Sequence, residues 1–411
     1  MRIIDLFSGA GGLTFGFYYK KINNEFLRTN HEFVFANEFD KYAASAFRKN
    51  YKNINMIEGD IRSITDEAIK EMVGDRPVDI IIGGPPCQSF STVGQRRYDE
   101  KAKLFFEYLR ILKIVKPKMF LFENVKGMLS MREIFYKLDA NGQIMKEKKK
   151  IGHEGGKQRE IEVPIIDHKG DRIIEVIKRE FGNIEENFGY EIKDYLVNAV
   201  DFGVPQNRER VVIVGIRKDL KIEKPKFQGD AKDKLTIEMA ISDLPNLKEG
   251  ERKEQYTIPT QTPYQEMMRK GATVLKDHYC GSYGEKIRIV IKNVKQGEGR
   301  NEFNQLVKDG LIDKKYYLTS GFANTYGRLE KNKPSTTITN NLATPSGLRC
   351  IHYEQDRALS PREGARIQSF PDWFEFVGSR TDITRQIGNA VPPLLALALA
   401  RKIEEVLGDK I

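Results

Sequence analysis

Cys87 is the residue whose setting most suggests chemistry. It stands in the segment GGPPCQSFS (83–91), where two glycines and two prolines follow an apolar run. The prolines fix their own φ angles and stiffen the turn, which would hold the thiol in one position. A cysteine is a nucleophile when its thiolate is favoured. The alternative interpretation is a small buried residue that follows a strand.

Two other segments place polar side chains where strands end or begin. Glu123 and Asn124 close the apolar stretch MFLFENV (119–125), and a carboxyl group there could exchange a hydrogen bond or proton with a ring nitrogen. Arg208 and Arg210 lie two apart in QNRER (206–210), on one face of a predicted strand, where both could bind a carbonyl or phosphate group. The alternatives are a loop carboxylate that caps a helix and a solvated strand face.

A glycine-rich turn suggests a ligand site near the start of the chain. DLFSGAGG (5–12) follows an apolar strand and precedes a helix, which is where open α/β folds bind nucleotide-like ligands. The spacing is not G-x-G-x-x-G, so a smaller adenosine-bearing ligand fits better than a dinucleotide. Glu38 and Asp60 end the next two strands, where they could bind ribose hydroxyls and an adenine amino group. The alternatives are an ordinary turn and two solvated carboxylates.

The elements that must position these residues alternate between strand and helix. Apolar segments predict strands at 2–7, 32–39, 55–61, 78–84 and 119–125, and helical patterns lie at 41–51, 66–73 and 104–115, with another from residue 13. This alternation predicts a largely parallel sheet with helices on both faces and right-handed crossovers. A helix at 172–181 and strands at 191–203 and 209–218 continue the pattern.

The rest of the chain divides the protein into three parts. We predict a catalytic domain at 1–219, interrupted at 139–172 by a basic insertion or loop that could add phosphate contacts or be merely solvated. Residues 220–345 lose the α/β alternation and predict a smaller, mostly β or irregular domain. Residues 346–411 are helical again, with helices at 360–370 and 382–407, and are expected to pack back on the first domain.

Composition narrows the class of protein. The formal charge of +10 and the pI of about 9.2 suit a polyanionic partner without proving one. The three cysteines are widely spaced and contain no C-x-x-C pair, which argues against a disulfide framework or a structural metal site. The N-terminus shows no leader pattern, and the longest apolar stretch, 390–400, is too short to span a bilayer. We expect a cytoplasmic protein with no membrane partner.

Taken together, the motifs resemble those of the prokaryotic DNA (cytosine-5)-methyltransferases. The matching segments are DLFSGAGGL, NEFD, GDI, GGPPCQSFS, ENVKG, QNRERV, LSPREGARIQSFPD and QIGNAVPP, in family order over roughly 1–125, 190–220 and 350–400. The resemblance implies a Rossmann-like methyltransferase sheet that binds S-adenosyl-L-methionine, released as S-adenosyl-L-homocysteine, with no metal. It implies a cofactor site formed by Phe7, Gly9, Gly11, Glu38, Phe39, Asp60, Ile61, Pro86, Asn389 and Val391.

The resemblance also implies a mechanism. Cys87 would add to C6 of a flipped cytosine, Glu123 would bind N3 and the amino group, Arg210 would hold O2, and Arg208 would support the site. The partner would be double-stranded DNA, methylated by a monomer in a specific sequence and protected from a cognate restriction endonuclease. The expected DNA contacts are Gln88, Ser91, Gly94, Arg96 and Arg97 in a closing loop, and Arg328, Lys331 and Thr337 in a target-recognition domain at 220–345.

Three other functions compete with this interpretation. A transfer-RNA cytosine-5 methyltransferase would share the fold, but the Cys-Phe-Thr signature of that branch is absent from the sequence. A non-catalytic DNA-binding protein is disfavoured because Cys87, Glu123 and Arg210 are all intact. A nicotinamide dehydrogenase is disfavoured by the glycine spacing.

Overall fold

The computed structural model describes residues 1–85, 102–137, 139–141, 143–151, 159–185, 188–229, 231 and 233–408. Its centre is a seven-stranded sheet in the order β12-β13-β7-β6-β1-β4-β5. The strands are β12 (Tyr190–Asn198), β13 (Glu209–Arg217), β7 (Met119–Val125), β6 (Ile80–Gly83), β1 (Arg2–Leu6), β4 (Glu32–Glu38) and β5 (Met56–Glu58). The five strands from β7 to β5 are parallel, and β13 is antiparallel to both of its neighbours. The predicted α/β sheet is confirmed.

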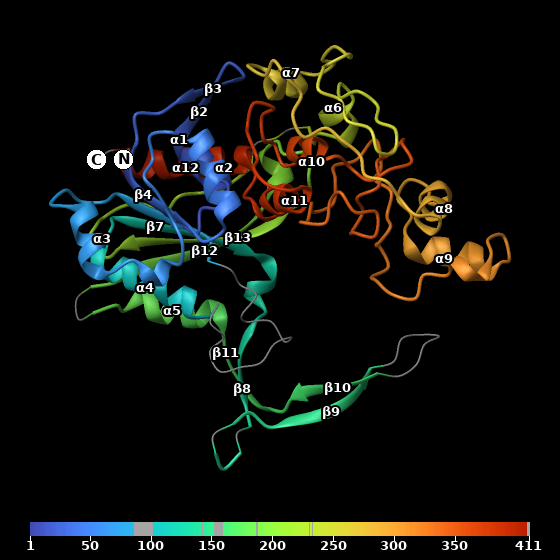
Figure 1. The fold of residues 1–411 in the computed structure, drawn as a ribbon. Helices are drawn as coiled ribbons and strands as arrows, with labels where there is room; N and C mark the ends of the chain where they lie inside the picture. Colours follow the sequence, from blue (N-terminus) through green and yellow to red (C-terminus); the bar gives the residue numbers. More distant parts are fainter. Residues whose placement is uncertain are drawn as a thin grey trace.

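Helices cover both faces of this sheet (Figure 1). Because side chains alternate along a strand, Ile3 and Ile4 of β1 enter two different apolar clusters. The first cluster contains side chains of α1 (Gly12–Tyr18), α2 (Lys41–Asn50) and α12 (Pro393–Leu407). The second contains side chains of α3 (Asp66–Val73), α4 (Ala102–Val115) and α5 (Ile173–Gly182). The two layers fix the strand ends on which the predicted site depends.

The C-terminal part packs back on the first domain, against α1, as expected. It contains α10 (Pro361–Ile367), α11 (Arg380–Asn389) and α12, so the helix predicted at 382–407 is two helices. The break falls at Pro392 and Pro393, and proline at the first position of a helix is well tolerated. Helix α12 packs against α1 so closely that a Cβ at Gly16 would collide with the backbone of Ala396.

Residues 220–345, predicted to be mostly β or irregular and to recognise the target, are called the recognition region below; they are largely irregular, as predicted, but contain helices in place of strands. Among its described residues the region forms no strand but four short helices, α6 (Ile237–Ile241), α7 (Pro263–Arg269), α8 (Glu285–Asn293) and α9 (Arg300–Lys308). Val290, Val294, Phe303 and Val307 of the α8–α9 pair form a small apolar cluster of their own. The helical spacing of these residues was obscured by the turn-rich segments around them.

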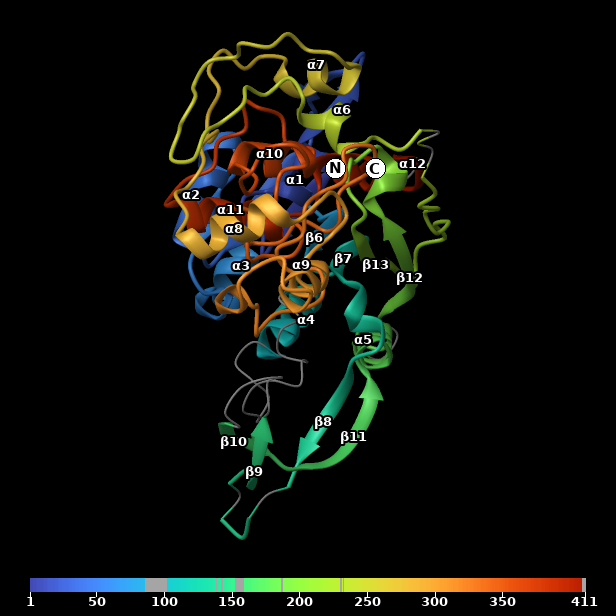
Figure 2. The same ribbon diagram turned by 90° about the vertical axis from the view of Figure 1, so that its right-hand side faces the viewer.

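The segment at 139–172, predicted as an insertion or loop, is an extended arm (Figure 2). Its strands are β8 (Arg132–Tyr136), β9 (Lys146–Ile151), β10 (Arg159–Pro164) and β11 (Ile166–Arg172), paired as β8–β11 and β9–β10. A second unpredicted feature is the hairpin of β2 (Tyr19–Ile22) and β3 (Glu25–Arg28). Its turn residues Asn23 and Asn24 both have positive φ, as a two-residue hairpin turn requires.

Short 3₁₀ turns complete the described elements: η1 (Ile61–Ser63), η3 (Lys126–Leu129), η4 (Ala199–Phe202) and η5 (Lys314–Tyr316). None of the helices in the described ranges combines the length and the apolar character needed to cross a membrane.

Candidate functional site

The glycine-rich turn between β1 and α1 has a backbone that few side chains would allow. Phe7, Gly9 and Gly11 all have positive φ, at 58°, 57° and 93°. A Cβ at Gly11 would run into the ring of Tyr51, whose hydroxyl donates to the Gly11 carbonyl at 2.6 Å. A Cβ at Gly9 would meet no atom within 4 Å, so this residue borders open space. The turn therefore leaves room beside Gly9 while it is held from behind by Tyr51.

Glu38 is fixed directly beside this turn. Its carboxylate accepts from the backbone N–H of Gly9 at 2.8 Å and from that of Asp40 at 2.7 Å. Desolvation raises the pKa of Glu38, while the two backbone donors oppose the shift. The next residue, Phe39, exposes 73% of its surface at the carboxyl end of β4. A carboxylate and an unpacked aromatic ring thus stand together at the sheet edge.

The two residues predicted after β5 differ in accessibility. Asp60 is partly exposed and caps η1 through the N–H of Arg62 at 2.9 Å. The Arg62 side chain also binds this carboxylate, and these hydrogen bonds hold the pKa of Asp60 below its usual value. Ile61 is only 2% exposed because its side chain enters the core. A ligand at this edge would therefore meet the Ile61 backbone rather than its side chain.

The C-terminal motif lies against the glycine turn, as predicted. A Cβ at Gly12 would collide with the carbonyl of Val391. Val391 is buried, and Asn389 is exposed at the end of α11. Of the predicted cofactor residues, the structure brings those of β1, β4 and residues 389–391 to one edge, and Pro86 lies outside the described residues.

Glu123 and Arg210 form an ion pair at the same edge of the sheet. Arg210 Nε lies 2.9 Å from Glu123 Oε1, and their side chains are 11% and 12% exposed. In the β7–β13 register Val212 pairs with Glu123, so Arg210 reaches Glu123 from the adjacent position on the same strand face. Burial raises the pKa of Glu123, whereas Arg210 and then Arg208 act to lower it. The structure thus brings together the carboxyl group and one of the two arginines that these segments singled out.

The chain that leads to Cys87 is anchored beside this pair. A Cβ at Gly84 would lie 2.9 Å from the Glu123 carbonyl, so only glycine allows this approach. Asn124 Nδ2 donates to the carbonyl of Pro85 at 3.0 Å. Cys87 itself lies outside the described residues, as do Gln88, Ser91, Gly94, Arg96 and Arg97.

Arg208 does not join Arg210 at the site, which corrects the sequence-based prediction. Strand β13 begins at Glu209, so the alternation that would align the two arginines does not extend to Arg208. Its guanidinium is 2% exposed and donates to the carbonyls of Ile338 at 2.9 Å, Gly388 at 2.8 Å and Ala390 at 3.0 Å. Nε finds no partner among the described residues. Arg208 therefore acts as a positioning residue that joins its own segment to the backbone at Ile338 and at 388–390.

The three residues predicted to contact DNA in the recognition region are engaged within the protein. Arg328 is 7% exposed and donates to four backbone carbonyls and to Asp356, so it is structural rather than available to a base. Lys331 pairs with Glu238 at 2.9 Å but remains partly exposed. Thr337 donates to the Asn207 carbonyl at 2.9 Å. No local pattern of residues indicates these partners, because they are distant along the chain.

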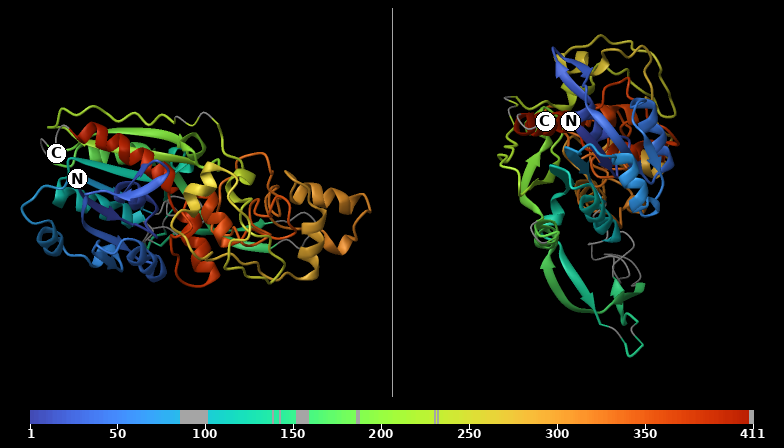
Figure 3. Two further views of the ribbon diagram at one scale, coloured as in Figure 1. Left: turned by 90° about the horizontal axis from the view of Figure 1, so that it is seen from above. Right: turned by 90° about the vertical axis from the view of Figure 1, so that its left-hand side faces the viewer.

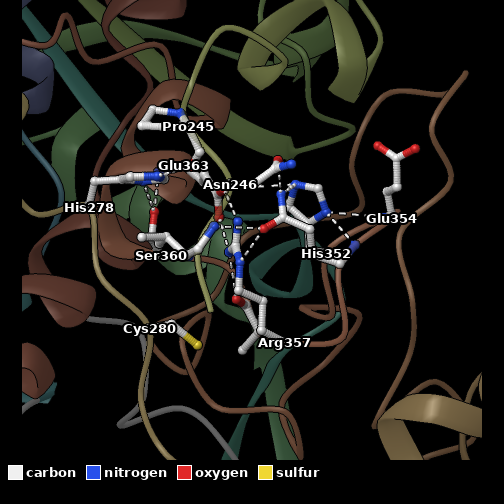
Figure 4. Close-up of polar contacts among 12 residues, drawn as sticks. Pro245, Asn246, His278, Cys280, His352, Glu354, Arg357, Ser360 and Glu363 are labelled. Atoms are coloured by element: carbon white, nitrogen blue, oxygen red, sulfur yellow. Dashed lines mark hydrogen bonds and ion pairs between the residues drawn. The ribbon is translucent and has the colours of Figure 1, made fainter. Parts of the chain in front are cut away.

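A buried polar cluster joins the recognition region to the segment before α10 (Figure 4). Arg357 donates to both oxygens of Glu363 at 2.7 and 2.6 Å, and both side chains are at most 2% exposed. His278 Nδ1 contacts Ser360 Oγ at 2.9 Å and its Nε2 contacts the Pro245 carbonyl at 2.7 Å. Although it holds histidine, serine and carboxylate groups, the cluster is enclosed and mutually satisfied, which indicates a structural role. Within the described ranges no group of three or more potential ligands could hold a metal ion.

The sheet, its glycine turn and the pair at its edge define the class. This is the fold of S-adenosylmethionine-dependent methyltransferases, seen also in the crystal structure of a "DNA modification methyltransferase encoded within prophage" (E. coli). That structure is 23% identical, aligns over 99% of both chains and has a TM-score of 0.69. The Dnmt2 methyltransferase of S. pombe shares the fold more distantly, with 15% identity and a TM-score of 0.53.

The chain belongs to the C-5 cytosine-specific DNA methylase family, whose model matches residues 1–152 and 164–405, and it is a DNA cytosine-5 methyltransferase. The Type II methyltransferase M.DdeI of Desulfomicrobium norvegicum is 33% identical over 98% of this chain and 88% of its own length. M.NgoFVII of Neisseria gonorrhoeae is 31% identical over 99% of this chain and 87% of its own. These full-length similarities confirm the predicted family and enzyme class.

Proposed function

We propose that the enzyme methylates C5 of a flipped cytosine in a specific duplex sequence through a covalent bond from Cys87 to C6. The observation that carries the proposal is the Glu123–Arg210 pair, 2.9 Å apart and mostly buried at the sheet edge. Two unlike groups side by side match the hydrogen-bonding edge of cytosine, which offers N3 and an amino group to the carboxyl and O2 to the guanidinium. Gly84 and Pro85 are fixed beside them, two residues before the nucleophile.

The residues near the glycine turn fit S-adenosylmethionine, which supplies an electrophilic methyl group when bound. The open space at Gly9, the anchored carboxylate of Glu38 and the exposed ring of Phe39 suit an amino acid moiety, a ribose and an adenine. Asp60, the Ile61 backbone, Asn389 and Val391 complete the proposed site, together with Pro86. A dinucleotide is a poorer match because the third glycine of its fingerprint is missing.

The residues of the chain divide the reaction between them. The Cys87 thiolate adds to C6, and Glu123 hydrogen-bonds N3 so that the ring accepts the added electrons and C5 becomes nucleophilic. Arg210 binds O2, where negative charge also develops. After C5 is methylated, its proton leaves to a base and the electron pair returns to expel the Cys87 thiolate from C6. The raised pKa of Glu123 favours its protonated form, which donates to N3.

The DNA surface is proposed to include the segment after Cys87 and the recognition region. Flipping a base costs a few kcal/mol, which contacts to the rest of the duplex must offset. Phe322 exposes 75% of its surface, and its carbonyl accepts from Thr325 Oγ1 at 2.8 Å, so a hydrogen-bonded turn presents the ring to solvent. Such a ring can stack on a base. Lys331 and Thr337 remain candidates, and Arg328 does not.

Labelled methyl transfer from S-adenosylmethionine to DNA tests the function. We expect transfer to duplex DNA but not to transfer RNA, and none by Cys87→Ala. Cys280→Ser is the matched control, since Cys280 is a buried thiol within residues 220–345 and we expect its loss to leave transfer intact. A 5-fluorocytosine duplex carrying the methylated sequence should trap a covalent complex with the wild type. Transfer by Cys87→Ala, or to transfer RNA alone, would overturn the proposal.

We further propose that the methylated sequence is that of a cognate restriction endonuclease, as the Type II names of the relatives suggest. Sequencing the methylated cytosines in a host that expresses the protein would identify the site. DNA from that host should then resist an endonuclease that cuts this sequence. Cleavage at fully methylated sites would refute a protective role.

A further inference from the structure

The arm of residues 132–172 consists of two successive two-stranded ribbons, β8–β11 and β9–β10, which meet at a bend (Figure 1). Residues 159–172 run through β10 and β11 and pair first with β9 and then with β8. The two pairings are joined by backbone hydrogen bonds from Ile165 to Met145 at 2.9 Å and from Met145 to Lys137 at 2.9 Å. At about 3.3 Å per residue, these fourteen residues have a contour length of roughly 45 Å.

The arm does not contribute to the hydrophobic core of the protein. None of its described side chains is buried, and Phe135, Met145 and Ile166 are between 40% and 44% exposed. Two-stranded ribbons are marginally stable alone. The match to the family model omits residues 153–163, which include most of β10, so this part of the arm belongs to the present chain rather than to the family pattern.

The arm begins at the catalytic edge. Strand β7 ends at Val125, two residues after Glu123, and only the η3 turn separates it from β8. The arm returns through α5, whose first residue, Ile173, donates to the Met131 carbonyl at 2.9 Å. From there it extends to the side of the molecule that carries α8 and α9 (Figure 1), and in the view from above it lies on that same side (Figure 3, left).

The outward strand of the arm carries a concentrated positive charge. Four of the six residues of β9 are lysines and one is Glu147. Lys146 and Lys148 are exposed on one face and enter no ion pair with any described residue, whereas Lys149 pairs with Glu147 at 3.0 Å on the other face. Glu162 lies opposite Lys148 on β10 and limits the positive field to a few charges. These few unpaired lysines suit contacts with a small number of phosphates rather than an extended nucleic-acid-binding surface.

We propose that the arm binds the phosphate backbone of the substrate duplex outside the recognised sequence. The inference rests on the proposed function, because it takes a duplex at the catalytic edge as its starting point. The contour length of the two ribbons, roughly 45 Å, is comparable to one turn of B-DNA, about 34–36 Å, so even with the bend between them the arm extends beyond the base pairs next to the target cytosine. A two-stranded ribbon also matches the width of the major groove. Lysines that meet phosphates position a protein without reading sequence.

The test compares duplex lengths. The triple variant Lys146→Ala/Lys148→Ala/Lys149→Ala is measured against the wild type on a 40-bp and a 12-bp duplex with the same central methylated sequence. For the 40-bp duplex, the slope of log affinity against log salt should fall in magnitude by about 2, since Lys146 and Lys148 carry the proposed phosphate contacts and each contact contributes about 0.9. For the 12-bp duplex the two proteins should bind alike, and the rate at saturating DNA should be equal on both.

The matched control removes three positive charges elsewhere, with Lys20→Ala, Arg401→Ala and Lys402→Ala on β2 and α12, at the opposite end of the molecule from the arm (Figure 1). This variant should keep the wild-type salt slope on both duplexes. An unchanged slope in the arm variant, or an equal loss on both duplexes, would overturn the proposal. Failure of the wild type to methylate either duplex would instead refute the proposed function, so the two failures are distinguishable.

Discussion

Replacing Arg208 by lysine separates a positioning role from a catalytic one. The guanidinium donates three hydrogen bonds, at 2.8–3.0 Å, to carbonyls of Ile338, Gly388 and Ala390. A lysine keeps a nitrogen donor at this position, but one amine nitrogen cannot occupy the positions of both terminal nitrogens of arginine, and a buried lysine gives up its charge more readily than arginine does. At least one bond is lost and one carbonyl is left without its partner.

The size of the effect follows from these bonds. A hydrogen bond from a charged donor contributes about 1.5–3 kcal/mol, and an unsatisfied buried carbonyl costs about 1–3 kcal/mol. We therefore expect Arg208→Lys to lower the free energy of unfolding by about 2–4 kcal/mol and the melting temperature by several degrees. Because Gly388 and Ala390 flank Asn389, the proposed cofactor site should loosen too. A loss of only 1.4 kcal/mol there raises the dissociation constant of S-adenosylmethionine about tenfold.

Scanning calorimetry and titration with S-adenosylmethionine without DNA measure both effects. Arg210→Lys is the matched control, because it makes the same change two residues away in a side chain that contacts Glu123 at the site surface. It should abolish most methyl transfer while leaving melting and cofactor binding close to wild type. The reasoning fails if Arg208→Lys melts and binds cofactor like the wild type yet loses methyl transfer, since Arg208 would then act at the base.

Three further outcomes are expected. Burial lowers the pKa of His352 from 6.5 to about 3, so below about pH 6.5 the unfolded chain binds a proton that the folded protein does not. The free energy of unfolding therefore falls by about 1.4 kcal/mol per pH unit as the pH falls toward 3. Between pH 7 and pH 5, urea unfolding should show a loss about 2 kcal/mol smaller in His352→Asn than in the wild type, and equal losses would contradict this. Arg328→Met should lower the free energy of unfolding by about 3 kcal/mol or more, because Asp356 and buried carbonyls lose their partner. If the folded variant instead methylates a different DNA sequence, Arg328 contacts a base after all. Phe322→Ala should leave melting unchanged, since the ring is 75% exposed, while weakening DNA binding by about 1–3 kcal/mol in a fluorescence titration; unchanged binding would remove Phe322 from the DNA surface.

The sheet and the ends of its strands were predictable because their signals are local. The strand β7 and the helix α3 have the predicted bounds, since an unbroken apolar run and a capped amphipathic helix each carry their own boundaries. Glu123 was placed at the end of its strand from its own segment, and its association with Arg210 followed from the resemblance to the family. In each case neighbouring residues sufficed to place the side chain at a strand end, and in parallel sheets these ends lie at the edge where ligands bind.

The predictions that failed concern partners distant along the chain. Arg208 was placed with Arg210 by strand alternation, yet its acceptors lie 130 and more residues away and its own residue precedes the strand. Arg328 was likewise predicted to be an exposed basic residue that contacts DNA. Its acceptors at 291–294 and 352–356, which bury it, are brought beside it only by the fold. The arm escaped prediction because β9 is charged at five of its six positions, so it lacks the alternation of a half-buried strand, and none of the arm's described side chains is buried.

The segment 206–210 links the Glu123–Arg210 ion pair of the proposed active site to the recognition region, so the positions of the two depend on each other. At one end Gln206 donates to Gln368 at 2.8 Å and accepts from the N–H of Ile338 at 2.8 Å, and at the other Arg210 contacts Glu123. Arg208, between them, joins Ile338 to the segment beside the proposed cofactor site. Any shift of Ile338 when the recognition region meets DNA must therefore move or break contacts that set both sites. Since packed interiors shift between discrete arrangements rather than deforming smoothly, this segment is where DNA recognition would be coupled to cofactor binding and chemistry.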